Sequence, residues 1–314
     1  MPAHPPSRTR LVLALCVAPA LALVACGGQG TSENVEPTAQ LRTVAHARGE
    51  TQVPADPQRI VVLEPVQLDT TVSLGRAPVG AAVLSEATGV PAYLGPEAAD
   101  IDSVGTVTEP SLEKIAALDP DLILGTESRH SALYDQLSTI APTVFMASQA
   151  DPWPDNVRLM GRTLGVEADA QALLDRYSAR CAEVAQKYGT AGSTAQLVRP
   201  RNDLLTLYGP TSFAGSTLEC AGFTTPPHDW GGSISADLSF ELVLEAKADH
   251  VFVTATEPGD ETAIPPAMAA VRDEAFPQLH VVDQAFWITG VGPRGGMAVL
   301  DDIERILSGR DRPR

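Results

Sequence analysis

The chain has 314 residues, of which 44% are hydrophobic and 5% aromatic, and its 39 acidic residues outnumber 22 basic ones. The formal net charge of −17 argues against a nucleic-acid-binding surface, which needs a basic patch, and against binding to anionic lipid headgroups. The length favours two domains with a sizeable core.

The first 25 residues have the pattern of a secretion signal. Two Arg precede an apolar run, Leu11–Ala25, which is shorter than the ~20 residues that a membrane-spanning helix needs. The junction Leu23-Val24-Ala25-Cys26-Gly27 resembles the lipobox of bacterial lipoproteins, in which the Cys thiol receives a diacylglyceryl group. We expect a lipoprotein signal peptide over 1–25 and lipidation at Cys26. The alternative is an ordinary secreted protein with a chance Cys at this point.

A tether and a first lobe are expected next. Residues 26–41 are rich in Gly, Ser, Thr, Glu and Pro, a composition typical of a flexible linker. Residues 42–155 then alternate between strands and helices, which indicates βαβ units and a parallel sheet. The predicted elements are a hairpin of Thr43–Ala47 and Thr51–Val53, strands Arg59–Leu63, Pro78–Val83, Leu122–Leu124 and Thr143–Phe145, and helices Gln67–Leu74, Leu112–Leu118 and Ala132–Leu137.

A long helical stretch and a second lobe complete the chain. Residues 156–190 form a predicted bridging helix, broken at most near Gly165, and apolar side chains recur along it at spacings of three and four. In residues 191–314 the alternation restarts. The predicted elements are strands Gln196–Val198, Leu204–Tyr208, His250–Thr254 and Leu279–Val282, and helices Ser216–Cys220, Phe240–Ala246 and Gly296–Leu307.

An internal repeat supports two similar lobes. Ser111–Leu124 aligns without a gap on Ser239–Phe252, and in each copy a Ser can cap a helix whose first turn holds a Glu, Glu113 or Glu241. A helix dipole alone favours an acid at this position. Two matched acids also suggest a second use, a pair of exposed charges that dock a partner.

Several catalytic classes lack their motifs. The first predicted strand is followed by Glu64-Pro65-Val66-Gln67 and not by a Gly-rich dinucleotide loop, and no P-loop or Gly-x-Ser-x-Gly elbow occurs. The six His are isolated in sequence, so no metal site is predicted. A carboxylate pair of the glycosidase kind stays open, because acids are plentiful.

Polar and aromatic residues gather at predicted strand ends and loops. Ligands of open α/β sheets sit beyond the carboxyl ends of strands, and Arg129 follows one such strand, while Arg199 and Tyr208 end two others; Trp230 and Trp287 lie in Gly-rich surroundings. Singly, each is as readily a surface ion pair or a core residue. Together they predict a cleft with cationic and aromatic walls, suited to an anionic ligand with a flat face.

An ordered set of segments after residue 42 carries a family resemblance. The segments are Pro57–Glu64, Leu74-Gly75, Pro78-Val79-Gly80, Val104-Gly105-Thr106, Pro110–Leu124, Ser128-Arg129-His130, Leu133–Phe145, Val198-Arg199, Tyr208-Gly209, Ser212–Gly215, Trp287 and Leu300-Asp301-Asp302. On them the chain resembles the lipoprotein substrate-binding proteins of iron–siderophore ABC importers, a fold group that also serves cobalamin and haem uptake.

The resemblance implies an α/β fold of two Rossmann-like lobes with parallel sheets, joined by a single long helix, with the ligand cleft between the lobes. Glu113 and Glu241 resemble the acids that meet Arg residues of the permease. Arg129 and Arg199 resemble positions that neutralise a ferric-siderophore anion, and Tyr208 and Trp287 would line the cleft. Two positions depart from the family pattern: Pro65 and Pro200 stand where aromatic residues are frequent.

The expected function is capture without catalysis. A monomer, lipid-anchored outside the cytoplasm to the bacterial cell membrane, would bind a ferric siderophore and deliver it to an ABC permease. The protein would need no cofactor and no metal ligands of its own, since the siderophore holds the iron. The alternatives are a secreted lipoprotein hydrolase with a cleft carboxylate pair, and a haem or cobalamin binder of the same fold.

Two further cysteines are left once Cys26 is acylated. Outside the cytosol Cys181 and Cys220 can pair, but both lie in predicted helices, and a bridge requires Cα atoms within ~7 Å. The sequence leaves open whether they are bonded.

Overall fold

The computed structural model describes residues 40–257 and 260–309. The expected signal peptide, Cys26 and nearly all of the expected tether lie outside the described residues. Within the described part of the chain, no helix is both long enough and apolar enough to cross a membrane.

The first lobe is built on a parallel five-stranded sheet, as predicted. Its strand order is β5-β4-β3-β6-β7, with β3 at Ile60–Val62, β4 at Gly80–Val83, β5 at Asp102–Thr106, β6 at Leu122–Thr126 and β7 at Thr143–Met146. Strands β3, β4, β6 and β7 are buried along their whole length, which is why they read as uninterrupted apolar runs. β5 was not predicted, because its sequence DSVGT lacks such a run.

Helices and a hairpin surround this sheet. The helices are α1 (Pro65–Ser73), α2 (Leu112–Ala117), α3 (Glu127–His130) and α4 (Tyr134–Ile140), with 3-10 turns η1 (Ala92–Leu94), η2 (Pro96–Ala98) and η3 (Ser131–Leu133). The predicted hairpin is present as β1 (Leu41–His46) and β2 (Gly49–Pro54). Gly49 has a φ of +106° at the turn, a conformation that glycine adopts without steric cost.

The second sheet is mixed, which corrects the expectation of a parallel one. Its order is β10-β9-β8-β11-β12, with β8 at Ala195–Arg201, β9 at Leu204–Tyr208, β10 at Ser235–Ser239, β11 at His250–Ala255 and β12 at Leu279–Asp283. β11 runs parallel to β8 and β12, whereas β9 is antiparallel to β8 and β10. Only Asn202 and Asp203 separate β8 from β9, and a parallel crossover needs a dozen residues or more.

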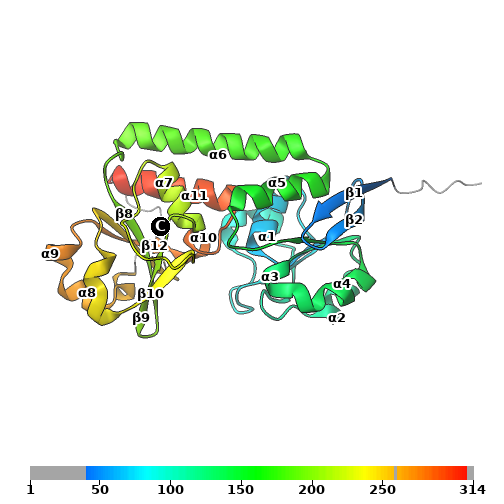
Figure 1. The fold of residues 1–314 in the computed structure, drawn as a ribbon, viewed down its shortest axis with the longest axis horizontal. Coiled ribbons are helices and arrows are strands. Elements are labelled where there is room, and N and C mark those ends of the chain that lie inside the picture. The colour runs from blue at the N-terminus through cyan, green and yellow to red at the C-terminus, as the bar shows by residue number, and fades with distance from the viewer. Residues whose placement is uncertain (1–39, 258–259, 310–314) are drawn as a thin grey trace, which may run out of the picture. The chain divides into compact units, whose positions relative to one another are not determined.

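The helical stretch between the lobes consists of two helices. α5 (Trp153–Leu164) ends at Gly165, which has a φ of +73°, and α6 runs from Glu167 to Tyr188. Figure 1 shows α6 extending from the side of α5 to the start of β8. The last helix, α11 (Pro293–Leu307), packs against both α6 and α1. The remaining helices are α7 (Phe213–Cys220), η4 (Phe240–Ala246), η5 (Glu261–Ala263), α8 (Pro266–Ala270), α9 (Arg272–Ala275) and α10 (Gln284–Trp287).

The two copies of the internal repeat fold differently. In the first, Ser111 caps α2 by accepting a hydrogen bond from the N–H of Lys114 at 3.3 Å. In the second, η4 is a 3-10 helix interrupted by non-helical backbone at Leu242, and Ser239 makes no side-chain cap. The prediction of a Ser-capped α-helix is therefore correct only for the first copy.

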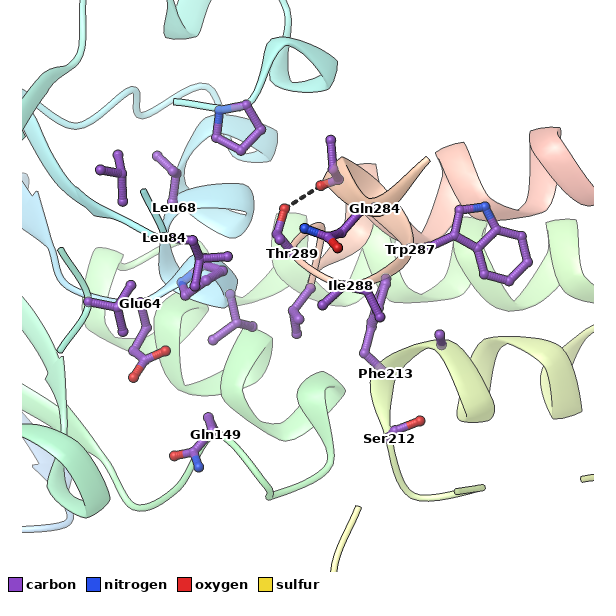
Figure 2. A pocket seen from close by; sticks show the side chains of 18 of the residues that line it. Glu64, Leu68, Leu84, Gln149, Ser212, Phe213, Gln284, Trp287, Ile288 and Thr289 are labelled. Carbon is purple, nitrogen blue, oxygen red and sulfur yellow. Dashed lines mark hydrogen bonds between the residues drawn. The ribbon is translucent and has the colours of Figure 1, made fainter. Parts of the chain in front are cut away.

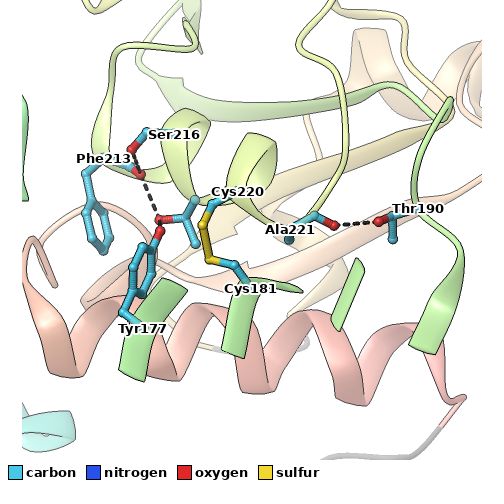
Figure 3. Close-up of a disulfide and its surroundings, with 8 residues drawn as sticks. Tyr177, Cys181, Thr190, Phe213, Ser216, Cys220 and Ala221 are labelled. Atoms are coloured by element: carbon cyan, nitrogen blue, oxygen red, sulfur yellow. Dashed lines mark hydrogen bonds between the residues drawn. A yellow bond between two sulfur atoms is a disulfide. The ribbon is translucent and has the colours of Figure 1, made fainter. Parts of the chain in front are cut away.

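A disulfide joins two helices. Cys181 on α6 and Cys220 on α7 are bonded, with their Cα atoms 5.4 Å apart (Figure 3). One turn earlier on α6, the hydroxyl of Tyr177 donates to Thr217 Oγ1 on α7 at 3.0 Å. α7 is thus fixed to the long helix by one covalent and one polar contact.

Candidate functional site

A cavity of about 970 Å³ is lined by residues from both lobes. Most of its wall follows the carboxyl ends of parallel strands: Glu64 comes after β3, Leu84 after β4, Arg129 after β6 and Gln284 after β12. Figure 2 shows Glu64 and Gln149 on the first-lobe side, and Ser212, Phe213 and Ile288 on the other. This is the edge at which open α/β sheets hold their ligands.

On the first-lobe wall, an arginine lies against a buried carboxylate. Arg129 Nε is 3.0 Å from Glu64 Oε1, and the two side chains are 35% and 2% exposed. Both line the cavity. Burial raises the pKa of Glu64 to about 7, although the charge of Arg129 opposes the shift. Among the described residues Oε1 has no aligned hydrogen-bond partner, so the contact with Arg129 is electrostatic; the Thr126 hydroxyl also lowers the pKa, by less than Arg129 does.

The second-lobe wall carries a cation without a partner. Arg199, on β8, is half-buried and lines the cavity, and its side chain makes no hydrogen bond or ion pair with any described residue. Arg201, two residues on, also lines the cavity but is held by Asp237 at 3.0 Å. Tyr208, at the end of β9, contributes to the same wall. The structure therefore brings Arg129, Arg199 and Tyr208 to one cavity.

The two tryptophans are placed differently from the expectation. Trp287 is itself among the lining residues, but its side chain is fully buried, its Nε1–H donates to Asp302 Oδ2 at 3.0 Å, and its ring stacks on Phe252. Figure 2 shows the indole directed away from the other labelled side chains. Trp230 is not among the lining residues; its indole packs against Gly209, where an added Cβ would meet the ring at 2.8 Å.

Other aromatic and apolar side chains supply the wall instead. Tyr93 lies on η1, and Phe213 follows the N-cap Ser212 of α7. Leu84, Ile288 and Val291 add apolar surface, and Leu84 is 51% exposed. Apart from Phe213, which begins α7 and belongs to the family-like segment Ser212–Gly215, these residues lie in loops and short turns where the sequence has no periodic pattern.

A second buried carboxylate lies on α1, close to this wall. Asp69 accepts hydrogen bonds from the backbone N–H groups of Arg294 and Gly295 at 2.9 and 2.8 Å, from the Tyr93 hydroxyl at 3.0 Å and from the Ser73 hydroxyl at 3.2 Å. Arg294 and Gly295 belong to the first turn of α11, whose free N–H groups suit an acid. The Arg294 side chain also binds Leu94 O and Glu97.

The two repeat acids face solvent. Glu113 on α2 and Glu241 on η4 are both exposed, and neither makes a hydrogen bond or ion pair with a described residue. Neither lines the cavity. Two apolar neighbours of Glu241, Leu242 and Leu244, are also exposed, at 46% and 59%.

Among residues 40–257 and 260–309, no group of three His, Cys, Asp or Glu side chains is arranged to hold a metal ion. The described cavity wall offers arginine, carboxylate, hydroxyl, amide and apolar groups.

Comparisons with known proteins agree with this architecture. Residues 56–268 match the family described as periplasmic binding protein. A relative named a probable siderophore-binding lipoprotein, YfiY of Bacillus subtilis, is 30% identical over 90% of this chain and 93% of its own length. The Fe(3+) dicitrate-binding periplasmic protein FecB of Escherichia coli is 31% identical over 61% of this chain and 65% of its own length.

Among solved structures, SirA of Staphylococcus aureus in complex with staphyloferrin B is 29% identical, with a TM-score of 0.73. The match covers 85% of this chain and 98% of that one. The family model spans more than half of the sequence, and the relatives match along most of it. The chain therefore belongs to the periplasmic binding protein family.

Proposed function

We propose that this protein captures a ferric siderophore outside the cytoplasm and delivers it to the permease of an ABC importer. One observation carries the proposal: two arginines from different lobes, Arg129 and Arg199, line one cavity of about 970 Å³ in a chain whose net charge is −17. Positive charge concentrated in one concave site of an acidic protein selects an anionic ligand. The relatives named for siderophore and ferric dicitrate binding support the same class.

The chemistry of the wall suits a ligand that brings its own metal coordination. Iron that is already enclosed by a chelator needs no protein ligand, only complementary charge and contact area. Arg guanidinium groups bind carboxylates and other oxyanions with paired donors. Tyr208, Tyr93 and Phe213 provide flat contact surfaces around them. Trp287 has no such role in this proposal, since its ring is fully buried, stacks on Phe252 and donates a hydrogen bond to Asp302.

A hydrolase has less support from the same wall. The acids that line the cavity are Glu64, Asp151 and Glu257, and only Glu64 is buried. Its charged neighbour is Arg129, which is not the second carboxylate that a glycosidase pair requires. We therefore propose a binding protein without catalytic activity.

Delivery is assigned to the two exposed acids. Glu113 and Glu241 project from separate lobes with no partner among the described residues, so both are available to cationic groups of a permease. The double variant Glu113→Ala/Glu241→Ala is expected to bind ligand normally and to lose transport. Intact uptake by cells that carry this variant would remove the docking role.

Anchoring through Cys26 completes the proposal. It rests on the junction Leu23-Val24-Ala25-Cys26, and the relative YfiY is itself named a lipoprotein. Cell fractionation of Cys26→Ser tests it: the variant should leave the membrane fraction, and retention there would contradict lipidation at this residue.

The capture role is tested by titrating the purified protein with ferric citrate, ferric staphyloferrin B, haem and cobalamin. Arg129→Ala and Arg199→Ala should each weaken binding of a ferric chelate about ten- to hundredfold, which corresponds to the ~1.5–3 kcal/mol of a charge-assisted contact. Arg158→Ala is the matched control, because Arg158 is an exposed arginine outside the cavity that pairs with Asp155. Binding of haem or cobalamin alone, or unchanged affinity in both cavity variants, would contradict the proposal.

A further inference from the structure

Glu64 is a carboxylate that the proposed capture role does not yet use. It lies in the cavity wall with 2% of its side chain exposed, and its Oε1 is 3.0 Å from Arg129 Nε yet lacks a hydrogen-bond partner. Its backbone has extended φ and ψ immediately before α1, and its side chain does not cap that helix. Fold formation therefore gives no account of an acid at this position, where an apolar residue would be cheaper to bury.

Among the charged and titratable groups near Glu64, one makes a charge interaction with it, and that group is Arg129. The ionisable residues of the cavity wall are Glu64, Tyr93, Arg129, Asp151, Arg199, Arg201, Tyr208 and Glu257. Of these, only Arg129 contributes a charge interaction to the pKa of Glu64. His130, the other titratable group of α3 near this wall, is held between Thr126 N–H and Val107 O. Asp151 accepts from Ser148 N–H at 3.0 Å.

Arg129 cannot serve Glu64 and a ligand equally well. A chelate that binds Arg129 through anionic oxygens weakens the only charge interaction that favours the ionised form of Glu64, and it brings further negative charge and excludes water. A buried carboxylate in that position binds a proton. Thr126 is a fully buried neighbour whose hydroxyl lowers the pKa of Glu64 although its Oγ1 makes no hydrogen bond of good geometry with a described residue; this hydroxyl can donate to the carboxylate or accept from the protonated acid.

We infer that Glu64 holds Arg129 while the cavity is empty and takes up one proton from solvent when anionic oxygens of the ferric chelate replace it on Arg129. The inference rests on the proposed function. No bond is made or broken apart from the new carboxyl O–H, and bulk water or buffer supplies the proton. Glu64 thus competes with the ligand for the arginine, and the competition is strongest where Glu64 is ionised.

The expected pH dependence follows from linkage. Because burial raises the pKa of Glu64 to about 7 in the empty cavity, the free protein carries an ionised Glu64 above this pH and a neutral one below it. Above about pH 7, each binding event takes up close to one proton, so the Kd rises by nearly tenfold per pH unit. Below about pH 6, the residue is neutral in both states and contributes no dependence.

The experiment is calorimetric titration with ferric citrate at pH 6, 7, 8 and 9, each in two buffers of different ionisation enthalpy. Glu64→Gln keeps the size of the side chain and cannot ionise. Glu127→Gln is the matched control, because Glu127 is on α3, pairs with Arg48 and does not line the cavity. Changes in the protonation of citrate itself are common to all three proteins and cancel in the difference between variants.

The wild-type protein and Glu127→Gln should take up about one more proton than Glu64→Gln at pH 8, and Glu64→Gln should bind about tenfold more tightly there. Equal pH dependence of the wild type and Glu64→Gln would overturn the inference, and so would weaker binding by Glu64→Gln, which would mark Glu64 as a direct ligand contact. Ferric hydroxamate and catecholate complexes are titrated in the same way. Failure of every ferric chelate to bind the wild type would instead refute the proposed function.

Discussion

Two carboxylates at the start of α1 are both buried but have very different surroundings. Glu64 is 2% exposed and Asp69 is not exposed at all, and burial raises the pKa of the first to about 7 and of the second to about 6. Asp69 accepts four hydrogen bonds, two of them from the first turn of α11. Glu64 has one charged neighbour and an oxygen without a hydrogen-bond partner.

Burial alone therefore does not distinguish an acid that stabilises the fold from an acid that serves the site. Asp69 satisfies N–H groups that would otherwise be unpaired at a helix start, and it joins residues 225 and 226 positions away in the sequence. The Glu64 side chain accepts no hydrogen bond with good geometry from a described residue, and its ion-pair partner in the cavity wall is an arginine that a ligand can take. The number of donors around each acid therefore favours a role in stability for Asp69 and a role in ligand binding for Glu64.

Substituting Asp69 should change the free energy of unfolding more than substituting Glu64 does. Asp69→Ala leaves the N–H groups of Arg294 and Gly295 and the Tyr93 hydroxyl without their acceptor, and each buried group left unsatisfied costs about 1–3 kcal/mol. We expect a loss of about 3–5 kcal/mol in the free energy of unfolding, measured by guanidinium titration. At pH 8, where Glu64 is ionised despite its burial, Glu64→Ala should not lower the free energy of unfolding. Similar losses in the two variants would remove the distinction.

The disulfide between α6 and α7 gives a stability contribution with which that of the Asp69 hydrogen bonds can be compared. Cys181 and Cys220 are 39 residues apart, and the loop-entropy account gives about 3–4 kcal/mol for a bridge of this span. Cys181→Ala/Cys220→Ala should therefore unfold at lower denaturant by that amount. Thiol counting on the denatured, unreduced wild type must first find neither cysteine free; two free thiols would mean that no bridge exists in the protein.

A smaller effect appears in the dependence of stability on pH. The pKa of Glu64 is about 7 in the folded protein against an ordinary value of 4.5, so the folded state binds more protons than the unfolded state between these values. Its contribution to stability is fully present below about pH 4.5 and is lost as the pH rises through about 7. Glu64→Gln should flatten the decline by about 1 kcal/mol per pH unit in this window.

Two histidines of the second lobe act in the opposite sense and provide the control for that measurement. Burial lowers the pKa of His280 to about 4 and also lowers that of His250, so their contribution to stability is lost as the pH falls below about 6.5. Because both are unchanged in Glu64→Gln, the difference between this variant and the wild type at pH 5, 6, 7 and 8 isolates Glu64. Parallel curves would show that Glu64 has an ordinary pKa.

Much of the architecture was predictable because buried parallel strands are continuous apolar runs. β3, β6 and β7 were predicted for this reason, whereas β10, with the sequence SADLS and a single buried residue, gives no such signal. The antiparallel β9 was predicted as a strand but in the wrong sheet type, since the alternation of elements suggests parallel pairing, whereas the two-residue turn before β9 permits only an antiparallel one.

The site was predictable where a charged or aromatic side chain lies at the end of a predicted strand, and Tyr208 at the end of β9 is one such residue. Arg129 and Arg199 meet this condition, and both line the cavity. The direction of a ring is not encoded locally: Trp287 lies in the right segment, but Asp302 and Phe252 hold its indole in the core. The role of Asp69 was likewise hidden, because its partners Arg294 and Gly295 are brought to it only by the tertiary fold.

A still smaller loss of stability is expected when the hydrogen bond between the cavity residue Tyr93 and Asp69 is removed. The Tyr93 hydroxyl donates to Asp69 Oδ2 at 3.0 Å, while the same residue lines the cavity and its ring packs edge-on against Phe286. Tyr93→Phe removes one of four donors to Asp69 and keeps the ring. A hydrogen bond to a charged group contributes about 1.5–3 kcal/mol, and three donors remain, so we expect a loss of about 1–2 kcal/mol.

A double-mutant cycle decides whether this loss belongs to the hydrogen bond with Asp69. If the Tyr93 hydroxyl stabilises the fold through Asp69, Tyr93→Phe should cost almost nothing in the Asp69→Ala background, because the acceptor is already gone. A full loss in both backgrounds would mean that the hydroxyl acts through another group. Ferric-chelate affinity in Tyr93→Phe adds an independent readout: it should stay within a few-fold of the wild type, since Asp69 anchors α11 through the two backbone donors that the substitution leaves in place.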